Sequence, residues 1–126
     1  MPTTVQEMLA AARAAVPSIR REEAEALMRD GRALVVDVRD AAEVQASGKV
    51  PGAVNVSRGM LEFRADPSAP SHDPAFDPDR TVLVYCASGG RSALAGKTLR
   101  ELGYRDVRNL GGFKDWVEAG GAVERG

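Results

Sequence analysis

Cys86 is the residue of this sequence that is best placed to act as a nucleophile. It follows residues 81–85, an apolar run with β-branched and aromatic side chains that predicts a buried strand. A loop of small residues comes next, and residues 92–102 predict a helix that stops at Gly103. Cys86 is therefore expected at the carboxyl end of a strand and beside a helix N-terminus, where open α/β sheets bind their ligands.

The surroundings of Cys86 favour a reactive thiolate over an inert buried thiol. A lone cysteine after a strand is more often a small hydrophobe, but here backbone N–H groups and a helix dipole would stabilise a negative sulfur. Arg91 adds a positive charge, and such neighbours lower a cysteine pKa from about 8.5 to roughly 3.5–7.5. The small loop residues would also let a substrate approach the backbone closely. The expected substrate-binding loop is Ala87, Ser88, Gly89, Gly90, Arg91 and Ser92.

Strands alternate with helices along most of the chain, which predicts a mainly parallel sheet with helices on both faces. The predicted strands are residues 33–38, 53–56, 81–86 and 107–110. The predicted helices are residues 22–29, 40–45, 58–64, 92–102 and 112–118. Residues 66–80 contain repeated prolines and predict a long loop.

Residues 1–17 predict a separate amphipathic helix at the N-terminus. Its apolar residues recur at helical spacing, and Pro17 ends it. They are Val5, Met8, Leu9, Ala12 and Val16. Two interpretations are open: the helix packs against the sheet of its own chain, or it contacts a partner.

Composition narrows the class of protein. The 126 residues fit one domain, and the net charge of −1 gives no general attraction to nucleic acid or to an anionic membrane. No apolar stretch approaches the ~20 residues of a membrane span, and no targeting signal is visible. The single cysteine rules out an internal disulfide and favours a reducing compartment, so a cytoplasmic location is expected. No metal or cofactor is expected, and the oligomeric state stays open.

Residues 86–92 resemble the active-site loop of single-domain rhodaneses, which are sulfurtransferases. Three further blocks are similar to motifs of that family, in the same order and spacing. They are residues 37–43, 48–55 and 110–120. The resemblance implies an α/β fold with a single rhodanese-like domain over residues 18–126. Lys49 stands where the family usually has His, and Ala122 where it often has Pro, but neither departure touches the loop.

The resemblance also implies a reaction. Cys86 would take the outer sulfur of a donor as a persulfide, and a thiophilic acceptor would then remove it. The donor would be a small anion such as thiosulfate, or a persulfide, bound by residues 87–92 with the charge of Arg91. Arg58 would also face the donor, unless it forms an ordinary surface pair with Glu62. The acceptor would be a thiol or cyanide, and a protein could serve as persulfide donor or acceptor.

Asp37, Arg39 and Glu43 are expected to support the loop rather than to react. Asp37 ends a predicted strand, and Arg39 and Glu43 are four residues apart where that strand leads into a helix. An ion-pair network there would fix the loop behind Cys86.

Three other functions are weighed against sulfur transfer by an enzyme. A cysteine-dependent phosphatase or arsenate reductase also uses a cysteine, a ring of N–H groups and an arginine, but places five residues between Cys and Arg. Only four residues separate Cys86 from Arg91, and the smaller loop suits a single sulfur atom. A non-catalytic binding module of the same fold often lacks the cysteine. A persulfide carrier would have the same chemistry with protein partners, so the sequence leaves it open.

Overall fold

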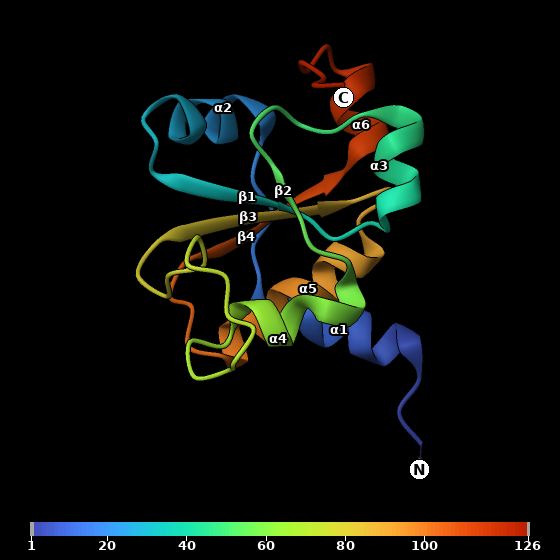
Figure 1. Cartoon of the computed structure of the whole chain (residues 1–126). Helices are drawn as coiled ribbons and strands as arrows, with labels where there is room; N and C mark the ends of the chain where they lie inside the picture. The colour runs from blue at the N-terminus through green and yellow to red at the C-terminus, as the bar shows by residue number, and fades with distance from the viewer. Residues whose placement is uncertain (1, 126) are drawn as a thin grey trace.

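The two most apolar runs of the sequence form the centre of the sheet. β1 (Ala33–Asp37) and β3 (Thr81–Cys86) pair in parallel, and nearly all of their side chains are buried. Burial on both faces is typical of central strands in a parallel sheet. The edge strands β2 (Val54–Asn55) and β4 (Val107–Gly112) complete the order β2-β1-β3-β4, with every strand parallel (Figure 1). The computed structural model describes residues 2–125.

Helices cover both faces of this sheet (Figure 1). They are α1 (Val5–Ala15), α2 (Arg21–Arg29), α3 (Ala41–Ser47), the 3-10 turn η1 (Arg58–Met60), α4 (Leu61–Ala65), α5 (Gly90–Glu101) and α6 (Phe113–Glu118). One core lies between the sheet and α4 and α5, and a second core lies under α2 and α6. The α/β architecture expected from the sequence is confirmed. Within the described residues, no helix is long and apolar enough to cross a membrane.

The N-terminal helix packs within its own chain. α1 lies against α5, with Ala12 fully buried, and Val16 at the end of α1 joins the core. Gly96 of α5 permits this close approach, because a Cβ there would lie 3.0 Å from the Val16 side chain. Val5 and Met8 remain exposed. The helix is thus covered by α5 rather than by the sheet directly, and a domain boundary after residue 17 stays a prediction.

Several predicted boundaries are wrong by a few residues. α5 begins at Gly90 rather than at residue 92, because Gly89 turns the chain with a φ of +103° immediately before it. β2 has two residues rather than four, because it pairs with β1 only as β1 ends, opposite Val36 and Asp37. Residues 58–64 begin as the turn η1 and become α-helical only from Leu61.

The long loop of residues 66–80 packs against the rest of the domain through a buried aromatic side chain. Phe76 is 1% exposed and packs edge-on against Tyr104, with ring centroids 6.4 Å apart. The Tyr104 hydroxyl donates to the Ala65 carbonyl at 2.7 Å, at the end of α4. The loop therefore leads into β3 along a fixed path, which helps to place Cys86.

Candidate active site

The Cys86 thiol lies where β3 ends and the loop of residues 87–92 begins. The residue is only 1% exposed, and its Sγ faces the first turn of α5. The Gly89 N–H donates to Sγ at 3.0 Å and the Ser92 N–H at 3.4 Å. The neutral Cys86 thiol donates to the Ser92 Oγ at 3.5 Å, and the Ser92 hydroxyl becomes a donor to the sulfur when Cys86 is a thiolate. The loop and the helix N-terminus thus direct backbone N–H donors at the sulfur, as the sequence predicts.

These donors lower the pKa of the Cys86 thiol below its ordinary value. Burial alone raises that pKa, because a thiolate loses its hydration. The Ser92 hydroxyl and the backbone N–H groups of Ser92, Gly89 and Ser88 outweigh burial by hydrogen bonding to the thiolate. A negative sulfur, whether thiolate or persulfide, is therefore the form that this site stabilises.

Two glycines allow the loop to close around the sulfur. Gly89 has a left-handed backbone, which a side chain would strain. Gly112, at the end of β4, lies directly against the loop: a Cβ there would come within 2.6 Å of the Ala87 carbonyl oxygen and 2.9 Å of the Ser88 Cα. The end of β4 therefore packs directly against the loop, and a larger residue than glycine at position 112 would displace the loop.

Asn109 is a site residue that the sequence analysis missed. Its Oδ1 accepts the Ser92 hydroxyl at 2.8 Å and the Gly111 N–H at 2.9 Å. Its Nδ2 lies 3.4 Å from the Gly89 carbonyl oxygen. Asn109 thus holds the one side chain of the loop that contacts the sulfur. The only available signal was a polar residue inside the last predicted strand.

Arg91 is paired with Glu43. Its Nη1 and Nη2 donate to the two carboxylate oxygens of Glu43 at 2.8 and 2.9 Å. Arg91 and the Asp40 N–H lower the pKa of Glu43 to about 2, and Glu43 in turn raises the pKa of Arg91. The residues expected to form one network form two separate ion pairs, and Glu43 pairs with Arg91 rather than with Arg39. The binding of a donor by Arg91 stays a prediction.

Arg39 and Asp37 form a second ion pair, which is buried. The Arg39 Nη2 lies 2.7 Å from the Asp37 Oδ2, with 3% and 0% of the two side chains exposed. Arg39 also donates to the Ser47 Oγ and to the Gly48 carbonyl, and its guanidinium lies 4.4 Å from the centroid of the Phe113 ring. Arg39 thus connects the end of β1 to the end of α3. A supporting role for Arg39 and Asp37, rather than a role in the reaction, stays a prediction.

Arg58 is directed along α5. Its guanidinium donates to Glu62 at 3.0 Å and to the Thr98 hydroxyl at 3.0 Å. Thr98 is six residues after Ser92 in α5. The contact between Arg58 and Thr98 therefore lies about 9 Å along the helix axis from Ser92, which contacts Sγ. The surface pair with Glu62 therefore exists, and a donor-binding role for Arg58 stays a prediction.

A groove of about 720 Å³ borders the loop on the α6 side. Its apolar lining comes from α3, the loop, α6 and the chain end: Ala46, Ala87, Phe113, Val117 and Val123. Because Ala87 directly follows Cys86, a molecule in this groove would lie beside the nucleophile loop. This groove is lined by a residue of the loop, Ala87, and by both Glu43 and Arg39.

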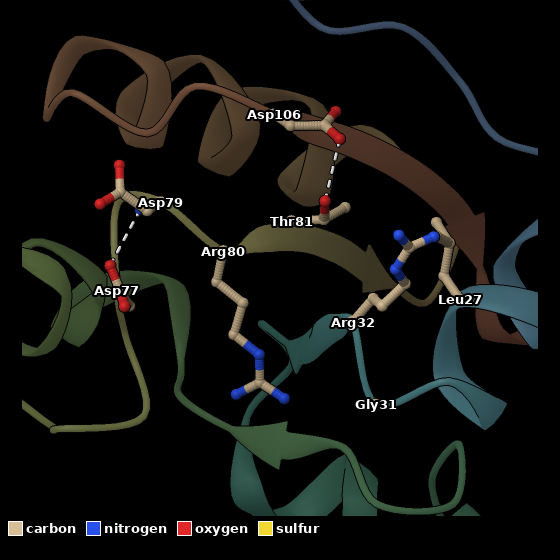
Figure 2. A pocket seen from close by; sticks show the side chains of 8 residues that line it. All are labelled: Leu27, Gly31, Arg32, Asp77, Asp79, Arg80, Thr81 and Asp106. Carbon is tan, nitrogen blue, oxygen red and sulfur yellow. Dashed lines mark hydrogen bonds between the residues drawn. The ribbon is translucent and has the colours of Figure 1, made fainter.

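A second hollow of about 610 Å³ lies at the opposite end of the sheet (Figure 2). Thr81 at the start of β3 lines it, together with Arg32, Arg80 and Asp106. The six residues of β3 place it about 17 Å from Cys86. Three acidic and two basic residues line it, and no residue that lines it is a cysteine or a histidine. This hollow is separate from the cysteine site.

Comparison with known proteins agrees with this geometry. Residues 20–119 match the family model described as the rhodanese-like domain. The human thiosulfate:glutathione sulfurtransferase is 32% identical over 113 residues, which cover 83% of this chain and 96% of that protein. The thiosulfate sulfurtransferase PspE of Escherichia coli is 36% identical over 80 residues, which cover 64% of this chain and 70% of that protein.

Among solved structures, a Rhodopseudomonas palustris protein of unknown function has a TM-score of 0.88 and 40% identity, over 98% of this chain and 99% of that chain. It is described as a possible tyrosine phosphatase. The family model and the sequence relatives together confirm the resemblance seen in the four motif blocks, and this chain belongs to the family of rhodanese-like domains.

Proposed function

We propose that this protein is a sulfurtransferase that carries sulfane sulfur on Cys86. The observation that carries the proposal is the environment of Sγ: a buried sulfur that accepts hydrogen bonds from Gly89 and Ser92 and whose pKa is lowered. A lowered pKa increases the share of Cys86 that is thiolate, so attack on a donor depends less on a general base. The sulfurtransferases among the relatives support the same reaction class.

The reaction would proceed in two steps through a covalent intermediate. In the first step the Cys86 thiolate attacks the outer sulfur of thiosulfate, the S–S bond of the donor breaks, and sulfite leaves with the bonding electrons. In the second step an acceptor thiolate or cyanide attacks the outer sulfur of the Cys86 persulfide, and the Cys86 thiolate returns. The outer sulfur would lie about 2.05 Å beyond Sγ, which brings it toward the mouth of the loop where an acceptor can reach it.

The donor and acceptor are proposed from chemistry and from the relatives. Thiosulfate and glutathione are named in the description of the human relative, and both suit a site that stabilises an anionic sulfur. A persulfide donor, a protein persulfide partner and cyanide as acceptor fit the same two steps. A reducing compartment such as the cytoplasm would keep the Cys86 thiol reduced and supply thiol acceptors.

Phosphatase activity is the second candidate, because the Rhodopseudomonas palustris protein is described in those terms. Two observations weigh against it. The loop has four residues between Cys86 and Arg91, and the Arg91 guanidinium, which would hold a phosphate, is occupied by Glu43 at 2.8 Å. Sulfur transfer from an uncharged persulfide needs the sulfur and its ring of N–H donors but no free cation, so neither observation weighs against it.

Intact mass spectrometry tests the proposal. Incubation with thiosulfate or a small persulfide should add one sulfur atom to the protein, and cyanide should remove it. Cys86→Ser should fold normally and gain no sulfur. If the wild-type chain gains no sulfur from either donor but hydrolyses p-nitrophenyl phosphate in a Cys86-dependent way, the phosphatase is the better description.

A further inference from the structure

The cation nearest the cysteine loop is already occupied by a carboxylate of the same chain. Both terminal nitrogens of Arg91 are bonded to Glu43, at 2.8 and 2.9 Å, so the pair is bidentate. Bidentate arginine–carboxylate pairs are the stronger kind of ion pair. An anionic donor that needs the Arg91 charge must therefore compete with Glu43.

Glu43 is held in place from its own helix as well. It is the third residue of α3, and its Oε2 accepts the N–H of the N-cap residue Asp40 at 2.9 Å, which completes a capping box. The N-terminal end of α3 also favours a negative side chain. Glu43 is thus a fixed competitor, which does not swing away from Arg91 without a loss of helix capping.

The other charges around the loop do not restore an attraction for a dianion. Asp37 and Arg39 neutralise each other in a buried pair, and Asp40 adds a negative charge near Arg91. Three carboxylates thus face two guanidinium groups, beside a cysteine that is itself favoured as an anion. The groove on the α6 side adds Lys114, Arg125 and Glu118, which brings the total to four carboxylates and four cations, so no net positive charge is left for a dianion.

We propose that Glu43 is a specificity-determining residue that, by occupying Arg91, biases this site against dianionic donors and toward persulfides. The inference rests on the proposed sulfur transfer. Thiosulfate brings two negative charges to the loop, whereas a protonated persulfide R–S–SH brings none at its reacting end. With the persulfide, the Cys86 thiolate attacks the outer sulfur, the S–S bond breaks, and R–S⁻ leaves while the proton stays on the new persulfide.

Glu43→Gln is the sharpest test, because glutamine also fits the capping box and so preserves α3. We expect kcat/KM for thiosulfate to rise about tenfold, the factor that one freed charge-assisted hydrogen bond provides. With the persulfide of 2-mercaptoethanol, an uncharged thiol, kcat/KM should change less than twofold. The thiosulfate rate of the variant should also fall more steeply with added salt, because a free cation is screened.

Glu25→Gln is the matched control. Glu25 is also a partly exposed carboxylate paired with an arginine, at 3.1 Å from Arg21 and away from the cysteine loop, so its loss changes the net charge equally. It should leave the ratio of thiosulfate to persulfide rates unchanged. In an Arg91→Gln background, Glu43→Gln should no longer raise the thiosulfate rate. Should Glu43→Gln unfold, Glu43→Asp, whose shorter side chain weakens the pair, should raise the thiosulfate rate by a smaller factor.

The outcomes separate this inference from the proposed function. If wild type gains sulfur on Cys86 from the persulfide but Glu43→Gln leaves the donor ratio unchanged, Glu43 does not set specificity and the inference is overturned. If Glu43→Gln lowers both rates equally, Glu43 only positions the loop, and the inference is again overturned. If wild type gains sulfur from neither donor, the proposed function itself fails.

Discussion

The Ser92 hydroxyl is the side chain that most directly sets the reactivity of Cys86. It lies 3.5 Å from Sγ and is fully buried. Ser92→Ala removes it without leaving an unpaired group, because Asn109 Oδ1 keeps the Gly111 N–H and the Gly89 carbonyl keeps the Ala93 N–H. Alanine also suits the first turn of a helix. The substitution therefore isolates one contribution to the thiolate.

The expected effect follows from the strength of a hydrogen bond to a charged group. Such bonds contribute about 1.5–3 kcal/mol, and the long 3.5 Å contact suggests the lower end. A loss of about 1.4 kcal/mol reduces the thiolate population about tenfold at a pH well below the thiol pKa. Ser92→Ala should thus raise the pKa of Cys86 and slow its alkylation about tenfold in mildly acidic buffer.

The rate of iodoacetamide alkylation, measured across pH, checks this expectation. Ser88→Ala is the control, because Ser88 lowers the pKa of Cys86 through its backbone N–H, which the substitution retains. The midpoint for Ser88→Ala should match wild type. Equal midpoints for Ser92→Ala and wild type would refute the reasoning, as would an equal rise in both variants, which would point to a general disturbance of the loop.

Three further predictions concern the supporting structure. Arg39→Met should lower the free energy of unfolding by about 3–5 kcal/mol in urea titrations, because it leaves Asp37 charged, buried and unpaired. The control Arg58→Met, at a half-exposed pair, should lower the free energy of unfolding by under about 1 kcal/mol. Gly112→Ala should slow Cys86 alkylation by displacing the loop, whereas Gly59→Ala, with open space around it, should not. The pKa of Glu43 is lowered from 4.5 to about 2, so the ionised Glu43 stabilises the fold fully above pH 4.5 and loses this effect as the pH falls toward 2. The melting temperature of Glu43→Gln should therefore fall less than that of wild type between pH 4.5 and pH 2.

Local patterns were enough to predict the fold. The runs that became β1 and β3 are short, rich in valine and apolar at nearly every position, which is typical of a strand buried on both faces. The apolar run and the small residues after it correctly placed Cys86, the proposed nucleophile, at the end of β3 and beside a helix N-terminus. Boundaries were less predictable: the length of β2 depends on where β1 ends, and β1 lies some twenty residues earlier in the chain.

The partners of the site residues could not be predicted in the same way. Asn109 and Ser92 are 17 residues apart, and Arg91 and Glu43 are 48 residues apart. Each pairing depends on how strands and helices are placed in space, which no local spacing encodes. Arg39 and Glu43 have the spacing of a helical pair, yet Arg39 lies before α3 and turns back to Asp37, which leaves Glu43 free for the loop.

This distinction changes how the motif itself should be understood. An arginine beside a reactive cysteine suggests an anion-binding site, because the sequence shows the charge without its partner. Here the partner is fixed by the cap of α3, so the arginine joins the loop to that helix and contributes less positive potential than its charge alone implies. The backbone N–H groups of Gly89 and Ser92 differ from Arg91 in this respect, because they donate to Sγ itself and not to a carboxylate. The preference of the site for an anionic sulfur should therefore depend on the backbone N–H groups of the loop. Its preference for one sulfur donor over another should depend on Glu43.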